Sequence, residues 1–112
     1  MSHHKKIDPL LLPIVKKLND LGLKTAFSCQ GNHPRSVPKI AYISFANGTK
    51  LPDSVKKEIK NRDWQIDHDQ EDGRSQVSVY SVSSDFVFET DELSQKNYDF
   101  ILGWKSLLGL CD

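Results

Sequence analysis

The sequence predicts an α+β fold, an antiparallel sheet of four to five strands with helices packed on it. Apolar residues recur at helical spacing in three segments, and apolar and polar residues alternate in segments between them. The alternating segments follow one another in pairs, as in antiparallel hairpins. The expected order is α-β-β-α-β-β-(β)-α, which favours α+β over a doubly wound sheet.

The first helix is expected to begin at Asp8-Pro9, an acidic cap followed by a proline whose missing N–H costs nothing there. Gly22 supplies a stop. Pro13 lies one turn inside, where we expect a kink. The apolar stripe of this helix consists of Leu10, Leu11, Ile14, Val15, Leu18 and Leu21.

Two strands follow, at residues 24–28 and 39–46. The side chains of the second strand point alternately to two faces, and the strand ends at the turn Asn47-Gly48. Its two faces are Ile40, Tyr42 and Ser44 on one side, and Ala41, Ile43 and Phe45 on the other. A short basic helix at residues 53–61 comes next, with Asp53 as its cap and Val55 and Ile59 toward the core.

Strands at residues 64–68 and 76–82 form a second pair around the turn at Asp72-Gly73, and residues 86–88 could add an edge strand. A last helix starts at Thr90, with acidic residues in its first turn that complement the helix dipole. Its broad apolar face, which should cover the sheet, is formed by Leu93, Phe100, Ile101, Trp104, Leu107, Leu108 and Leu110.

The chain of 112 residues suits one domain, at residues 7–112, after a disordered tail at 1–6. No apolar run is long enough to span a membrane and no signal peptide is recognisable, so we expect a cytoplasmic protein. Cys29 and Cys111 are too few for a disulfide framework and are expected to be thiols.

Charge is unevenly distributed along the chain although the net charge is zero. Residues 1–62 hold twelve Lys/Arg and four Asp/Glu, whereas residues 63–112 hold three and eleven. A basic face would attract a phosphate-bearing ligand, and an acidic face would attract a basic partner. The plainer alternative is that the two sets interleave on the surface.

The loop after the first strand is the main candidate site. Gly31 and Asn32 tolerate positive φ, so successive backbone amides could face an anion, and neighbouring side chains add donors. A solvated turn remains the alternative. The candidate ligand-binding residues are Ser28, Cys29, Gln30, Gly31, Asn32, His33, Arg35 and Lys39.

Other chemistry has weaker support in the sequence. Cys29 with His33 would be a nucleophile and base, or two ligands of a metal, but a single C-x-x-x-H spacing fixes neither. Strand alternation separates His68 from the adjacent carboxylates. We therefore expect no catalytic residues, no metal and no cofactor. The aromatic residues considered for stacking on a base are Tyr42, Trp64, Tyr80 and Tyr98, of which at most one is expected to do so.

Residues 7–45 carry a resemblance. An acid-led helix, Thr25-x-x-Ser28-Cys29 and x-Gly31, followed by Tyr42-Ile43-Ser44-Phe45, resemble small uncharacterised bacteriophage proteins with a Ser-Cys-x-Gly-His loop. The helix and Ser-Cys-x-Gly segment are more distantly similar to wybutosine-synthesis tRNA methyltransferases, whose functional region would map onto Ser28 to Gly31. Gln30, Asn32 and His33 depart from these motifs, and a methyltransferase would need further residues for its methyl donor.

The function we expect is that of a small non-catalytic phage-type domain binding a phosphorylated, nucleotide-like ligand through residues 28–35, so as to sequester a host signal. One alternative is an inhibitor that binds a host protein through the acidic 63–92 surface. Another is a relative of RNA-modifying enzymes. A homo-oligomer and a nucleic-acid partner remain open, and no membrane partner is expected.

Overall fold

The computed structural model describes residues 8–32, 39–68, 73–79 and 89–110. Within these ranges it contains three helices and a four-stranded antiparallel sheet, in the order α-β-β-α-β-β-α. The predicted α+β class is confirmed. The expected tail at 1–6 and the edge strand at 86–88 lie outside the described residues.

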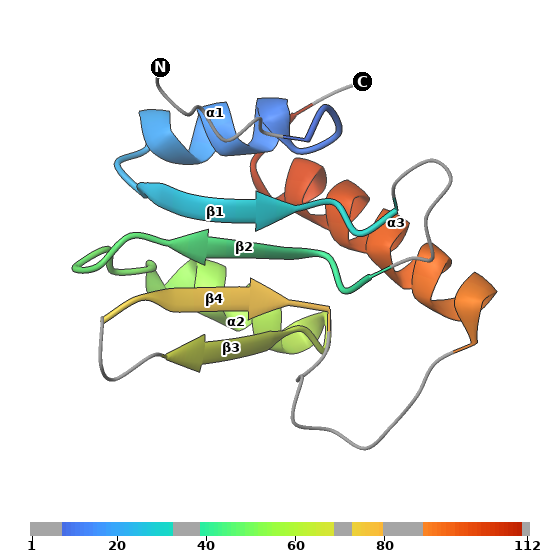
Figure 1. The fold of residues 1–112 in the computed structure, drawn as a ribbon. Helices are drawn as coiled ribbons and strands as arrows, with labels where there is room; N and C mark the ends of the chain where they lie inside the picture. Colours follow the sequence, from blue (N-terminus) through green and yellow to red (C-terminus); the bar gives the residue numbers. More distant parts are fainter. Residues whose placement is uncertain (1–7, 33–38, 69–72, 80–88, 111–112) are drawn as a thin grey trace.

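The sheet has the strand order β1-β2-β4-β3, so the two predicted hairpins meet through β2 and β4 (Figure 1). The helices are α1 (Leu12–Asp20), α2 (Asp53–Asn61) and α3 (Thr90–Leu107). The strands are β1 (Thr25–Cys29), β2 (Tyr42–Phe45), β3 (Gln65–His68) and β4 (Ser75–Ser78). The bounds of α2 match those predicted, but Asp53 is its first helical residue and not its cap, because Pro52 holds the cap position. Strand β1 is shifted by one residue from the prediction, β2 and β3 are shorter, and β4 begins one residue earlier and ends earlier.

The first helix begins later than its sequence suggests. The carbonyl of Asp8 accepts bonds from the N–H groups of Leu11 (2.9 Å) and Leu12 (3.1 Å), which makes a turn before regular helix starts. Pro13 therefore lies in the first helical turn, where no intrahelical N–H bond is lost. The loss of a hydrogen bond from which a kink at Pro13 was expected therefore does not arise.

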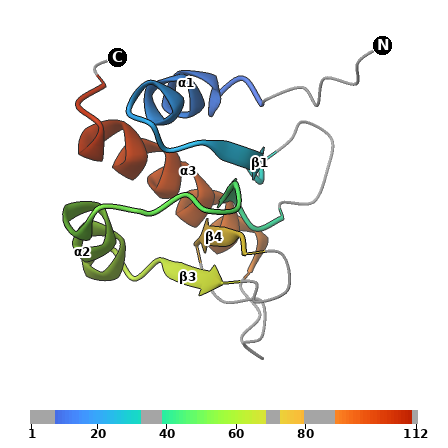
Figure 2. The same cartoon turned by 90° about the vertical axis from the view of Figure 1, so that its left-hand side faces the viewer.

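One face of the sheet is covered by helices. Ile43, Val77 and Ile66 are aligned across β2, β4 and β3, so their side chains share a face. Ile43 and Val77 are completely buried. Figures 1 and 2 show α2 and α3 on this face and α1 beside β1. The last helix thus covers the sheet as predicted.

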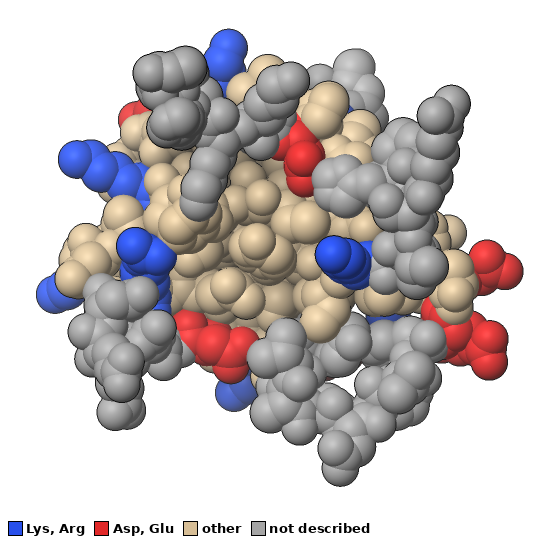
Figure 3. Space-filling model, in the orientation of Figure 1, with Lys and Arg blue, Asp and Glu red and all other residues tan. Residues whose placement is uncertain are grey.

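The opposite face carries mixed residues. Register places Phe27, Ser44, Gln76 and Asp67 in one row across it, and Cys29, Tyr42, Ser78 and Gln65 in the next. Figure 3 looks onto this face, and the part visible at its centre is formed by uncharged residues. Basic and acidic residues both lie at its margin, so on this side the two charge signs interleave.

An aromatic cluster fills the core between α3 and the sheet. The rings of Trp64 and Trp104 stack with centroids 5.5 Å apart, and Trp64 contacts Phe100 at 4.7 Å. Phe45 completes the cluster. Burying a side chain of this size contributes about 1.5–3 kcal/mol. Trp64, considered above for stacking on a base, is therefore a core residue.

The two ends of the predicted apolar stripe of α1 are exposed, although the stripe was expected to face the core. Ile14, Val15 and Leu18 are buried, but Leu10 and Leu21 are 39% and 55% exposed. Both lie just outside the regular helix, where helical spacing no longer determines which way a side chain points.

Candidate functional site

The candidate residues lie at the end of β1 and in the chain that leaves it. Ser28 and Cys29 are the last residues of β1, and both are half-buried. Gln30, Gly31 and Asn32 follow, while His33 and Arg35 lie outside the described residues.

A backbone hydrogen bond joins the two ends of the loop between β1 and β2. Lys39, which is exposed, donates its backbone N–H to the carbonyl of Gly31 at 2.9 Å. The chain thus returns to the point that it left before β2 begins.

Gln30 connects the loop to the start of the first helix. Its backbone N–H donates to Asp8 Oδ2 at 2.8 Å, and its Oε1 accepts from the N–H of Leu10 at 3.3 Å. Its Nε2 donates to the carbonyl of Asn32 at 2.7 Å. With a side chain only 6% exposed, Gln30 holds the loop in place instead of facing a ligand.

A buried asparagine from α3 fixes both ends of the loop. Asn97 is completely buried, and its Nδ2 donates to Asn32 Oδ1 (2.9 Å) and to the carbonyl of Lys39 (2.7 Å). Its Oδ1 accepts from the N–H of Ala41 at 2.9 Å. All three bonds satisfy a polar side chain that would otherwise be costly to bury. The sequence analysis missed Asn97.

Gly31 is required where the loop passes Asn97. Its φ is +84°, a conformation that L side chains rarely adopt. A Cβ at this position would lie 2.5 Å from the carbonyl oxygen of Lys39 and 2.6 Å from Cγ of Asn97. The positive φ anticipated for Gly31 is confirmed, and its role is a close approach between backbone and helix.

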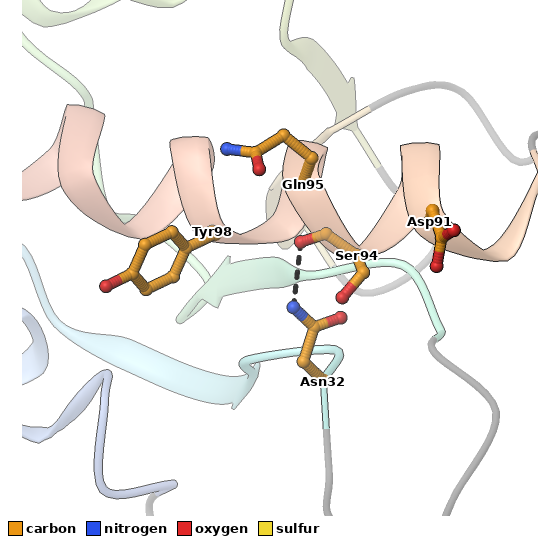
Figure 4. Close-up of a pocket in the computed structure, with 5 residues that line it drawn as sticks. All are labelled: Asn32, Asp91, Ser94, Gln95 and Tyr98. Carbon is orange, nitrogen blue, oxygen red and sulfur yellow. Dashed lines mark hydrogen bonds between the residues drawn. The ribbon is translucent and has the colours of Figure 1, made fainter.

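A polar hollow of about 320 Å³ lies between Asn32 and the exposed side of α3 (Figure 4). Asn32 donates its Nδ2 to the carbonyl of Ser94 at 2.8 Å, which attaches the loop to one wall. Tyr98, with a side chain 49% exposed, lies toward one end of the hollow and Asp91 toward the other. The lining residues are Asn32, Asp91, Ser94, Gln95 and Tyr98.

Only some of the predicted ligand-binding residues line the hollow. Asn32 lines it with an aromatic residue, Tyr98, that was one of the four considered for stacking on a base. Gln30 and Lys39 do not line it. Asp91, Ser94 and Gln95 were not among the candidates, although their spacing with Tyr98 places all four on one side of a helix.

Tyr42 lies at the loop end of the other sheet face, in register with Cys29. Burial raises the pKa of the Tyr42 phenol above its usual value of 10.0, and the nearby Cys29 and Asp8 add to this. The phenol is therefore neutral at physiological pH. On the same face, the guanidinium of Arg74 lies 4.9 Å from the centroid of the Phe27 ring, a cation–π contact.

Within residues 8–32, 39–68, 73–79 and 89–110, no three His, Cys, Asp or Glu side chains are grouped so as to hold a metal ion. Two considered pairings involve residues beyond those ranges. His33 is the partner considered for Cys29, and Asp69 is the second of the two carboxylates beside His68.

No protein-family model, curated protein or solved structure matches this chain. Among the described helices, none is long and apolar enough to cross a bilayer.

Proposed function

We propose that this chain is a small non-catalytic domain that binds a phosphorylated, nucleotide-like ligand at the loop after β1. The observation that carries the proposal is the hollow of about 320 Å³, in which Asn32 of the loop faces α3 beside the half-exposed ring of Tyr98. This volume is near the lower limit of about 300–1,000 Å³ for small-molecule sites. An aromatic ring with polar neighbours suits a nucleobase.

Pre-organisation of the loop supports this proposal. Asn97, Gln30 and Gly31 fix the position of Asn32 through bonds of 2.7–2.9 Å and one close backbone approach. A wall that is already ordered loses little conformational entropy when a ligand binds.

The phosphate end of the ligand is assigned to the loop side of the hollow. Lys39 is exposed at the end of the loop, and the candidate residues His33 and Arg35 belong to the same loop of the sequence. The carboxylate of Asp91, at the end of the hollow away from Tyr98, would repel a phosphate. A nucleotide would therefore place its base along α3 and its phosphate toward the loop.

Binding without turnover gives the domain a sequestering role. If the chain is phage-encoded, as the resemblance of residues 7–45 suggests, a nucleotide signal of the host is the natural target. The protein would then act in the host cytoplasm by lowering the free concentration of that signal.

Isothermal titration against a panel of ribonucleotides and cyclic nucleotides at low salt tests the proposal. We expect at least one to bind, and Tyr98→Ala to weaken that binding about tenfold or more by removing a stacking surface. Leu102→Ala is the matched control, because Leu102 is 41% exposed one helical turn further on and does not line the hollow. Absence of heat with every nucleotide would remove the proposal.

The acidic surface supports a second candidate function, inhibition of a basic host protein. The described acidic residues of the 63–92 segment are all exposed: Asp63, Asp67, Glu89, Asp91 and Glu92. Affinity capture from host lysate, with a variant in which Asp67 and Glu89 are changed to Lys, distinguishes this function. A specific partner that the variant fails to retain would support it.

The third candidate is a relative of RNA-modifying enzymes. It rests on the Ser28 to Gly31 motif alone. Methyl transfer to tRNA that depends on Cys29 or His33 is the minimum result that would support it, and transfer unaffected by either substitution would count against it.

A further inference from the structure

The side-chain amides that line the hollow each use one of their two N–H donors within the protein. Asn32 Nδ2 donates to the carbonyl of Ser94 at 2.8 Å, and Gln95 Nε2 donates to Asp99 Oδ1 at 3.0 Å. Asp91 contributes a carboxylate, which only accepts hydrogen bonds. Among the described residues that line the hollow, none is basic. The hollow therefore favours a ligand edge that supplies donors.

We infer that the hollow selects guanine over the other nucleobases, through hydrogen bonds from the base to the carboxylate of Asp91. This inference rests on the proposed function. Guanine presents N1–H and N2–H₂ side by side, and the two oxygens of a carboxylate accept such a pair in parallel. Adenine presents one amino group beside a ring nitrogen that is an acceptor, so this nitrogen would face the carboxylate unfavourably.

The arrangement of side chains along α3 fits a purine. Asp91, Ser94 and Tyr98 are at positions i, i+3 and i+7, so they lie on one side of the helix. Asp91 and Tyr98 are separated by seven residues, or about 10 Å along the helix axis. Figure 4 shows Ser94 and Asn32 between them. The edge of the base can meet Asp91 while its ring lies across Ser94 toward Tyr98.

Titration of the full chain with GMP, IMP and AMP tests this inference. IMP retains N1–H but lacks the N2 amino group. We expect GMP to bind about tenfold or more tightly than IMP and AMP, because a hydrogen bond to a charged acceptor is lost. Asp91→Asn should reduce GMP affinity to that of IMP, since an amide offers a single acceptor oxygen.

Glu92→Gln is the matched control. Glu92 is the next residue in the first turn of α3, is exposed and does not line the hollow, and the substitution changes net charge equally. We expect it to leave the ratio of GMP to AMP affinity unchanged.

The outcomes separate the inference from the function on which it rests. Equal affinities for GMP and AMP, or a preference for GMP that survives Asp91→Asn, would overturn guanine selection and leave nucleotide binding in place. Failure of all three nucleotides and of the wider panel would overturn both. Binding of agmatine, a guanidinium compound, without binding of any nucleotide would also overturn both and assign the hollow to a cationic ligand.

Discussion

Gly31 and Asn97 form the contact on which the geometry of the candidate site depends. The glycine lets the loop pass directly over the buried amide, and the amide then bonds to residues on both sides of the excursion. A larger residue at 31 would separate the loop from α3. Loss of the amide would leave the N–H of Ala41 and the carbonyl of Lys39 without this partner.

Gly31→Ala is expected to destabilise the protein by about 2–4 kcal/mol, because the positive φ and the close approach both oppose a Cβ. Gly22→Ala is the control: its φ is +85°, but a Cβ there would meet nothing within 4 Å. We expect that change to cost only about 1–2 kcal/mol. Urea unfolding measures both, and equal costs would contradict the importance of the Asn97 contact.

Tyr42 provides a prediction for alkaline pH. Because burial raises the pKa of its phenol in the folded state above 10.0, the folded form keeps the proton longer than the unfolded form. The contribution of the neutral Tyr42 phenol to the free energy of unfolding is fully present below the pKa of Tyr42 in the unfolded chain. It is lost as pH rises through the pKa of Tyr42 in the folded protein. Absorbance of phenolate should show a late titration step that Tyr42→Phe abolishes. A titration without a late step would contradict this assignment.

Several features of the candidate site could not be read from the sequence for a physical reason. Asn32 bonds to Ser94 and Asn97, which are 62 and 65 positions away in the chain. Local spacing showed that the loop holds donors, but not that Gln30 and Asn32 use theirs within the protein. One signal existed for Asn97: it precedes Phe100, Ile101 and Trp104 at helical spacing, so a polar residue lay on an apolar face.

Among the elements, α3 serves three purposes, two of them through its buried side and one through its exposed side. Phe100 and Trp104 pack in the aromatic core, Asn97 holds the loop, and Tyr98 lines the hollow. Any shift of this helix relative to the sheet would therefore alter the core and the site together.

Gly103 sets how closely α3 approaches the sheet. A Cβ at this position would lie 2.7 Å from Cζ2 and 2.8 Å from Cη2 of the Trp64 ring, which is itself buried and cannot easily move. Gly103→Ala should thus lower stability by about 1–3 kcal/mol despite a gain in helix propensity of about 1 kcal/mol.

Ser106→Ala controls for propensity, since Ser106 is exposed on the same helix. It should be neutral or slightly stabilising in thermal unfolding. If Gly103→Ala were equally harmless, the close packing of α3 against Trp64 would not be a constraint.

The elements themselves were largely predictable from local pattern. The bounds of α2 follow from Asp53 in its first turn and from Val55 and Ile59 four residues apart, both of which are buried. Alternation correctly separated Ile43 and Phe45 from Tyr42. The start of α1 was misplaced because the Asp8 carbonyl closes a turn before the helix, and a turn and a helix start share the same sequence signals.

At the scale of the molecule, the two oppositely charged parts of the chain are intermixed. Strand β4 lies next to β2 in the sheet, and α3 runs behind β1 and β2 (Figure 1). The acidic first turn of α3 thus belongs to the same layer as the helices from the basic part. Sequence position alone could not have distinguished this arrangement from two separate faces.

The extent of the domain gives a prediction at this scale. Removal of residues 2–6 should change the free energy of unfolding by less than about 0.5 kcal/mol, because the sequence predicts a disordered tail there. Asp8→Ala, by contrast, leaves the N–H of Gln30 without its carboxylate and should cost about 1–3 kcal/mol. Urea unfolding compares the two, and a shortened chain as unstable as Asp8→Ala would move the domain boundary upstream.

The closed base of the loop has a consequence for how this protein can evolve. The Lys39–Gly31 bond and Asn97 hold both junctions of the loop, so the end of β1 and the start of β2 are fixed independently of the sequence between the junctions. Insertions, deletions and exchanges at residues 33–38 should be tolerated with little cost in stability. The sequence of this short segment can then change during evolution while the junctions and the elements that they join stay the same.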